Sequence, residues 1–254
     1  MKRKARLTQV VEVIDLSPHL RRIVVGGEGL AGFPVGQEGA YVKVIVPKDG
    51  ERMPCLDLTN VAERPTMRSY TIRSFDAEHK RLVMDFVVNR HQGPATDWAI
   101  NARIGDYVGI AGPGPVKLTN FSESSYLLIG DITSVNAING YVPRINADAC
   151  VQVVIVVPTR EDAISLDIDD MHTVHWLVED EMDISLVQMV RNFSADIPPE
   201  TEVFLGLEAK NIRALRPFLQ DELGICRSRI HAVGYWKCGV NADTFSLEKK
   251  ARPL

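Results

Sequence analysis

Residues 68–73 read Arg68-Ser69-Tyr70-Thr71-Ile72-Arg73, and the fold of the chain is best worked out from this stretch. Its residues alternate in a way typical of a β-strand, where successive side chains point to opposite faces. An aromatic ring, strand backbone groups and an arginine fork together suit a flat, anionic cofactor. An ordinary antiparallel strand with solvated arginines explains the same residues equally well.

The helix expected shortly after this strand strengthens the first interpretation. It follows His91, and its start at Gly93 and Pro94 suits a first helical turn. Free amides of such a turn, together with the helix dipole, form an anion site. We expect Trp98 and Ile104 to lie on the buried side, with Ala102 between them. A plain connecting helix is the alternative.

The composition is that of an ordinary globular protein. The chain has 254 residues, of which 45% are hydrophobic and 24% charged, so one large or two ordinary domains are expected. The formal net charge of -4 argues against nucleic acid or a membrane surface as a partner. No apolar run approaches the ~20 residues of a membrane span, and no signal-peptide core follows the basic N-terminus. We therefore predict a cytoplasmic protein, with a monomer as the favoured state.

The cysteines predict no metal centre. They are scattered along the chain as Cys55, Cys150, Cys226 and Cys238. None has the spacing of a zinc ribbon or an iron–sulfur ligand set. Reduced structural thiols are expected in a cytosolic protein. If the protein transfers electrons, an organic cofactor must carry them.

The first 118 residues predict an antiparallel β-barrel or sandwich, because short β-favouring runs are separated by turn signals. The expected strands cover residues 7–14, 20–25, 41–46, 68–73, 82–88 and 107–111.

From residue 119 the pattern changes to apolar runs that alternate with helical segments. Runs of this kind suit a parallel sheet buried on both faces, so residues 119–254 predict a doubly wound α/β domain with a C-terminal tail. Pro217 predicts a kink or a late start of the last helix before that tail. The turn at residues 130–134 follows the first of these strands, which makes Asp131 and Thr133 candidate nucleotide-binding residues. It lacks a Gly-x-Gly-x-x-Gly run, and Asp131 is equally well explained as a helix-start residue.

Four segments together resemble the siderophore-interacting proteins, which are FAD-binding ferric-siderophore reductases of the ferredoxin–NADP reductase superfamily. The segments cover residues 68–73, 91–98, 130–133 and 234–239. The resemblance implies two domains: a flavin-binding, ferredoxin-reductase-like β-barrel over residues 1–118 and an α/β NAD(P)H-binding domain over residues 119–254. It further implies FAD as cofactor, NADH or NADPH as electron donor, and a ferric siderophore as small-molecule substrate.

The resemblance also assigns roles to individual residues. Tyr70 would stack on the flavin ring, Thr71 would hydrogen-bond the ring, and Arg68 would meet a phosphate. Tyr235 and Trp236 would close over the flavin, with a domain-interface pair as the alternative. The implied cofactor-binding residues are Arg68, Ser69, Tyr70, Thr71, Asp85, Val87, His91, Gly93, Pro94, Ala95, Thr96, Asp131, Thr133, Tyr235 and Trp236.

The choice between NADH and NADPH stays open. Arg160 follows the second expected α/β strand, where a cation could meet the 2′-phosphate of NADPH. Glu161 and Asp162 come directly after it and argue for NADH. The family's usual Gly-Asp-Glu-Thr turn carries Ile132 in place of the glutamate.

The expected reaction passes electrons from NAD(P)H through FAD to the ferric iron of a siderophore, and Fe(II) is released in the cytoplasm. No side chain needs to act as an acid or base, so no catalytic residue is predicted. An anionic acceptor calls for an open basic cleft, and each candidate is alternatively a solvated surface charge. The candidates are Lys48, Arg52, Arg64, Arg73 and Lys237. Two other functions remain open: an FAD-dependent reductase of ferredoxin, flavin or a quinone, and a non-catalytic flavin- or siderophore-binding module.

Overall fold

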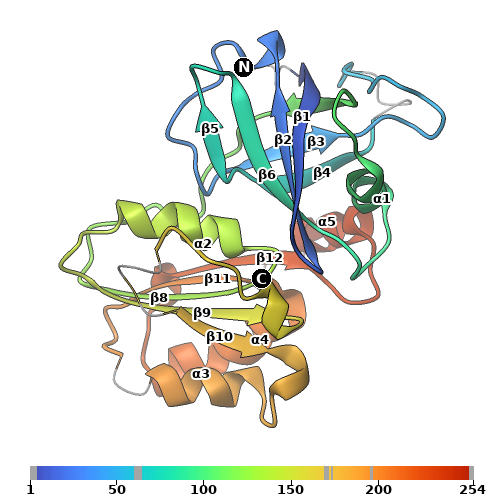
Figure 1. Ribbon diagram of the computed structural model, residues 1–254. Helices are drawn as coiled ribbons and strands as arrows, with labels where there is room; N and C mark the ends of the chain where they lie inside the picture. Colours follow the sequence, from blue (N-terminus) through green and yellow to red (C-terminus); the bar gives the residue numbers. More distant parts are fainter. Residues whose placement is uncertain (1–4, 60–64, 169–171, 173, 195–196, 252–254) are drawn as a thin grey trace. The chain divides into compact units, whose positions relative to one another are not determined.

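The chain folds into two compact units, Met1–Val116 and Lys117–Leu254. The computed structural model describes residues 5–59, 65–168, 172, 174–194 and 197–251. The first unit is built on an antiparallel sheet and the second on a parallel sheet with helices (Figure 1). Within the described residues, no helix is both long and apolar enough to cross a membrane.

The N-terminal unit is a seven-stranded antiparallel sheet with the strand order β4-β3-β7-β1-β2-β6-β5. Its elements are β1 (Ala5–Ser17), β2 (Leu20–Gly26), η1 (Glu28–Leu30), β3 (Tyr41–Ile45), β4 (Met67–Thr71), β5 (Ser74–Asp76), β6 (Arg81–Val87), α1 (Pro94–Asn101) and β7 (Tyr107–Ala111). The sheet is curled. β4 and β6 stand far apart in the strand order, yet the Arg73 amide just after β4 donates to the Val83 carbonyl of β6 at 2.9 Å. The antiparallel architecture expected from the sequence is confirmed.

Two details of this unit differ from the sequence-based expectation. The strand expected over residues 68–73 ends at Thr71, and Ile72 turns into the core, where it is fully buried. Helix α1 ends at Asn101, so Ile104 lies beyond it and is 73% exposed. Placing Ile104 on the buried side was therefore wrong. Ala102 is buried and Trp98 packs against the core, as expected, and Ala95, Thr96 and Ala99 are buried as well.

The C-terminal unit is a five-stranded parallel sheet with the order β10-β9-β8-β11-β12. Its strands are β8 (Ser125–Asp131), β9 (Cys150–Val157), β10 (Val174–Val178), β11 (Glu202–Glu208) and β12 (Ile230–Trp236). Its α-helices are α2 (Val135–Tyr141), α3 (Leu186–Ser194), α4 (Ala209–Pro217) and α5 (Ala242–Ala251), and its shorter turns are η2 (Val142–Arg144), η3 (Arg160–Asp162), η4 (Glu179–Glu181), the π-helical η5 (Phe218–Glu222) and η6 (Arg227–Arg229). Helix α2 covers one face of the sheet, and α3 and α4 cover the other (Figure 1). The predicted doubly wound domain is confirmed.

The strand order defines where a ligand would bind. β8 comes first in the chain and lies in the middle, with β9 and β10 on one side and β11 and β12 on the other. The topological switch point therefore lies between β8 and β11. Ligands of open α/β sheets bind beyond the carboxyl ends of the strands at this point.

Pro217 lies in the last helix before α5, where the sequence predicted a kink or a late start. α4 ends at Pro217, and the chain continues as the π-helical η5. A proline lacks the amide that continues α-helical bonding, so the change of helix type at this residue has a direct cause.

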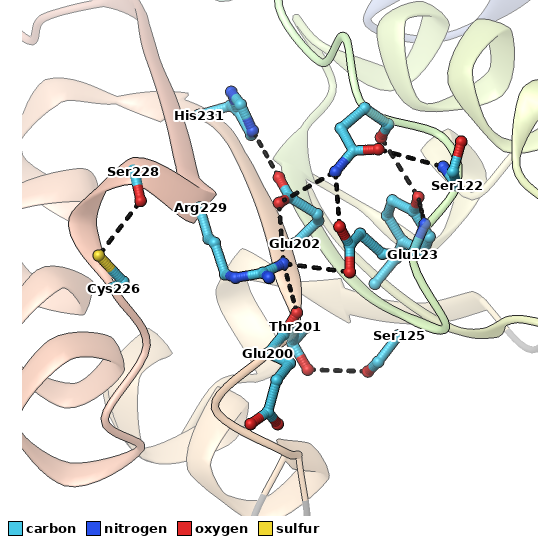
Figure 2. A network of polar contacts seen from close by, with 12 residues as sticks. Ser122, Glu123, Ser125, Glu200, Thr201, Glu202, Cys226, Ser228, Arg229 and His231 are labelled. Atoms are coloured by element: carbon cyan, nitrogen blue, oxygen red, sulfur yellow. Dashed lines mark hydrogen bonds and ion pairs between the residues drawn. The ribbon is translucent and has the colours of Figure 1, made fainter.

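A polar network fixes the amino ends of β11 and β12 (Figure 2). The buried carboxylate of Glu202 lies 2.7 Å from Nε2 of His231 and 3.1 Å from a guanidinium nitrogen of Arg229. Arg229 also donates to the Glu200 carbonyl at 2.8 Å. Because these ends are opposite the carboxyl edge of a parallel sheet, we assign the network to stability rather than to ligand binding.

All four cysteines carry free thiols, and Cys150, Cys226 and Cys238 are exposed. The thiols are unpaired, as the expectation of reduced cysteines requires, and these three lie at the surface.

Candidate functional site

The strand that carries the candidate flavin residues is an edge strand. Among the described strands, β4 pairs only with β3, so its second edge presents backbone N–H and C=O groups to a ligand. Ser69 is exposed, and its hydroxyl accepts a hydrogen bond from Lys43 Nζ at 2.7 Å. Lys43 lies directly opposite Ser69 in β3. This cation beside the strand was missed by sequence reasoning, because it becomes a neighbour only through strand pairing.

Tyr70 belongs to a row of aromatic rings that joins three elements. Its ring centroid lies 3.9 Å from that of Phe86 in β6, and the Phe86 centroid lies 5.7 Å from that of Trp98 in α1. Burial raises the pKa of Tyr70 far above its ordinary value, whereas nearby Arg68 and a hydrogen bond with Thr96 act in the opposite direction. Burial dominates, so Tyr70 stays a neutral phenol at physiological pH.

The start of α1 lies beside Tyr70. No side chain caps this helix at Gly93, and Pro94 occupies its first turn. The hydroxyl of Thr96 lies 3.0 Å from Nε2 of His91 and also hydrogen-bonds Tyr70. The structure thus brings together residues from two segments that the sequence identified separately, 68–73 and 91–98. The uncapped first-turn amides beside them are suited to an anion.

Burial lowers the pKa of His91, Asp97 opposes this shift, and Arg90 adds to it. The imidazole is therefore neutral near physiological pH, and a phosphate bound beside it would favour its protonated form.

Asp85 is held by a partner that the sequence did not reveal. Its side chain is 1% exposed, and its two carboxylate oxygens accept hydrogen bonds from Arg22 at 2.7 and 2.9 Å. Arg22 lies directly opposite in β2. Val87 is buried near the end of the same strand, opposite Leu20. The cofactor-lining role of Asp85 and Val87 stays a prediction.

In the C-terminal unit, the turn after β8 is closed by its own hydrogen bonds. One oxygen of the buried Asp131 carboxylate accepts from the Thr133 amide at 2.9 Å and from the Thr133 hydroxyl. The other accepts from the indole N–H of Trp236, at the end of β12, at 2.8 Å. Burial raises the pKa of Asp131, although these hydrogen bonds act to lower it. Three predicted site residues thus lie together, with the carboxylate facing protein donors.

Ser134 fills the switch point. Its buried hydroxyl donates to the Gly206 carbonyl at 2.6 Å. A Cβ added at Gly130 would lie 2.3 Å from Ser134 Oγ, and one added at Gly206 would lie 2.6 Å from Ser134 Cβ. These two glycines, which pair across β8 and β11, therefore leave the space that the serine occupies. The sequence placed Gly130 and Ser134 in the candidate nucleotide-binding turn, but the contact of Ser134 with Gly206 appears only in the structure.

The predicted acceptor-binding cations belong to both units. The Arg52 guanidinium lies 5.7 Å from the centre of the Tyr107 ring, and Lys237 Nζ lies 2.7 Å from Glu248. Lys237 is therefore engaged rather than free. Lys48 and Arg73 lie in the N-terminal unit, and Arg64 lies outside the described residues. A shared acceptor-binding role for these cations stays a prediction.

Comparison with known families assigns both units. Residues 9–117 match the siderophore-interacting FAD-binding domain, and residues 123–239 match the siderophore-interacting protein domain. The chain belongs to the siderophore-interacting protein family. The resemblance found in the sequence is confirmed, and FAD is the cofactor that the matched N-terminal domain binds.

Relatives of this siderophore-interacting protein span nearly its whole length. It is 28% identical to the ferric vibriobactin reductase ViuB of Vibrio cholerae serotype O1, with 96% of this chain and 93% of the relative covered. It is similar to the crystal structure of SipS from Aeromonas hydrophila, with 29% identity, a TM-score of 0.82 and 98% of both chains covered. It is also similar to a siderophore utilization protein from T. fusca, with 30% identity, a TM-score of 0.80 and 95% of both chains covered.

Proposed function

We propose that this siderophore-interacting protein is an FAD-dependent reductase that uses NADH or NADPH to reduce ferric iron bound to a siderophore. The observation that carries the proposal is the meeting of Tyr70, Thr96 and His91 beside the open edge of β4. The similarity to ViuB, a ferric vibriobactin reductase, supports the choice of substrate class.

The residues of the N-terminal unit fit FAD in two respects. An edge strand offers backbone donors and acceptors to the ring heteroatoms, and the uncapped start of α1 offers amides to the pyrophosphate. Arg68 would add a positive charge on the same strand, and His91 would lie beside the phosphates. Tyr70 would supply an aromatic surface already fixed by Phe86. When bound, FAD supplies the chemistry that links a two-electron hydride donor to one-electron reduction of Fe(III).

The C-terminal unit would bind the nucleotide donor beyond the carboxyl ends of β8 and β11. Asp131 and Ser134 are occupied within the protein there, so they would shape the site rather than contact the nucleotide. The Fe(II) product is held more weakly by ligands that favour Fe(III), and we expect its release in the cytoplasm.

The test begins with the absorption spectrum of the purified protein. We expect the bands of oxidised flavin, their loss on anaerobic addition of NADH or NADPH, and a ferrous-chelator signal once a ferric siderophore is added. Thr96→Val keeps the shape of the side chain but removes the hydroxyl between His91 and Tyr70. It should weaken FAD binding, measured by fluorescence titration, by a few-fold. Thr119→Val, at an exposed position of the other unit, is the matched control.

A colourless protein that does not bind added FAD would refute the cofactor assignment. A flavoprotein that neither nucleotide can bleach would refute the reductase assignment and leave a flavin-binding module.

A further inference from the structure

Arg160 lies where α/β domains distinguish NADH from NADPH. It opens η3 directly after β9, and η4 follows the neighbouring strand β10. Because β9 and β10 are parallel, both short helical turns lie at the carboxyl edge of the sheet. At this edge a carboxylate commonly binds the ribose 2′-hydroxyl of NADH, whereas an arginine accommodates the 2′-phosphate of NADPH.

The Arg160 guanidinium is engaged by a carboxylate. Its Nε donates to Glu181 of η4, although the Arg160 side chain is 80% exposed. The start of η3 is itself fixed, because the Asp162 carboxylate accepts from the Thr159 amide at 3.1 Å and from the Thr159 hydroxyl at 2.8 Å. These two hydrogen bonds form a capping box, which holds Arg160 at the carboxyl edge of the sheet, where Glu181 also lies.

The charge around this ion pair is strongly negative. The two segments 160–162 and 179–181 read Arg-Glu-Asp and Glu-Asp-Glu, with one cation and five carboxylates. The negative field of Glu179 reaches the turn after β8, where it contributes to raising the pKa of Asp131. A 2′-phosphate, with a charge of roughly −1.5 to −2, would have to displace Glu181 and approach the other carboxylates.

A hollow of about 430 Å³ lies beside the ion pair. Arg160 and Glu181 line it together with Trp176, Met182 and Met189. An indole and two thioethers offer flat, polarisable surface to a purine ring, and Glu181 offers an acceptor to a sugar hydroxyl. The lining therefore suits the adenosine part of a dinucleotide that has no phosphate on its ribose.

We infer that the Arg160–Glu181 pair makes the C-terminal unit selective for NADH over NADPH. Glu181 neutralises the cation that a 2′-phosphate would need and accepts the hydrogen bond of a free 2′-hydroxyl. The inference rests on the proposed nucleotide-dependent function and names the donor.

Two measurements test it. Stopped-flow bleaching of the bound flavin gives the nucleotide dependence of reduction, and calorimetry with NAD⁺ and NADP⁺ gives binding without turnover. In the natural protein we expect kcat/KM for NADH to exceed that for NADPH by on the order of tenfold or more, because the 2′-phosphate of NADPH would lack one or two favourable charge contacts or meet repulsive ones. Glu181→Gln should free Arg160 and tighten NADP⁺ binding by about fivefold to tenfold, while NAD⁺ affinity falls slightly.

Two further variants separate the ion pair from general charge. Glu161→Gln removes the exposed carboxylate that follows Arg160 in the chain and leaves the Arg160–Glu181 pair in place, so it should improve NADP⁺ binding much less. Arg160→Gln in the Glu181→Gln background should abolish the gain.

A natural protein that prefers NADPH, or a Glu181→Gln variant whose gain survives the loss of Arg160, would overturn the inference while leaving the reductase intact. Absence of bleaching and binding by both nucleotides would overturn the donor assignment itself.

Discussion

The Asp131 side chain provides the sharpest stability test of this structure, because two opposing effects act on one buried carboxylate. Burial disfavours its charged form, and hydrogen bonds from Thr133 and Trp236 favour that form. The perturbation is Asp131→Asn, which keeps the size of the side chain. One amide oxygen can still accept from Thr133, but the NH₂ group would face the Trp236 indole N–H, so two donors would meet.

The magnitude follows from the bond that is lost. A hydrogen bond to a charged group contributes about 1.5–3 kcal/mol. Trp236 is 36% exposed, so its N–H can partly recover a water partner, and the variant no longer buries a charge. We therefore expect Asp131→Asn to lower the free energy of unfolding by about 1–2 kcal/mol at neutral pH. Asp131→Ala, which removes every acceptor, should cost about 3 kcal/mol.

The sign of the pH dependence follows from the raised pKa. The native state binds the Asp131 proton more tightly than the unfolded chain does. The stability contributed by this group is therefore full below the ordinary carboxyl pKa and is lost as pH rises through the folded pKa. Asparagine does not titrate, so the stability difference between natural protein and variant should shrink from acidic to neutral pH.

Urea unfolding followed by far-ultraviolet circular dichroism, at several pH values, measures both quantities. The control is Asp148→Asn in the same unit, where the side chain is exposed and a change within about 0.5 kcal/mol is expected. A difference for Asp131→Asn that grows as pH rises would show that the hydrogen bonds outweigh burial, and would refute the reasoning.

Three further predictions concern other sites. FAD binding should raise the pKa of His91, which burial lowers in the free protein. Histidine NMR titration with and without FAD should show this shift, and an unmoved pKa of His91 would mean that the pyrophosphate lies elsewhere. Glu202→Ala should destabilise the C-terminal unit by about 3 kcal/mol, because it leaves Arg229 and His231 without their buried partner. The control Glu222→Ala removes an exposed partner of Arg191 and should cost less than about 1 kcal/mol. Equal losses of stability in urea unfolding would contradict this assignment. In an alkaline titration Tyr70 should ionise only when the protein unfolds, because burial keeps the native phenol protonated. Tyr70→Phe should therefore reduce the tyrosinate absorbance that appears on unfolding. A reduction of the absorbance that appears before unfolding would show that Tyr70 is accessible in the native protein.

Local signals were enough to predict the elements and their classes. Turn residues between β-favouring runs gave the antiparallel unit, and apolar runs alternating with helical segments gave the parallel one. Pro217 predicted a disturbance of its helix, expected as a kink or a late start, and α4 instead ends at this residue because proline lacks the amide that would continue it. Errors arose where an element's end depends on tertiary packing. Ile72 leaves β4 to enter the core, and Ile104 lies beyond the end of α1.

The candidate site was predicted as a list of residues but not as a set of contacts. Side chains such as Tyr70, His91 and Thr96 were recognisable because each stands in a distinctive segment. Arg22, the partner of Asp85, and Lys43, the partner of Ser69, stand in unremarkable segments. They become neighbours only through the pairing of β2 with β6 and of β3 with β4. Strand register is set by many side chains at once, so no single segment encodes it.

The sequence by itself determined the division into a β unit and an α/β unit, the family, and the residues beside which a flavin is expected to bind, because these depend on residue types at short spacing. Only the tertiary structure decided that the Asp131 carboxylate binds Trp236, that Ser134 occupies the switch point, and that Glu181 engages Arg160. Each of these contacts joins groups from different segments of the chain. Whether a charged side chain is free for a ligand depends on which partner the fold places within hydrogen-bonding distance, and that partner is fixed by packing rather than by neighbouring residues.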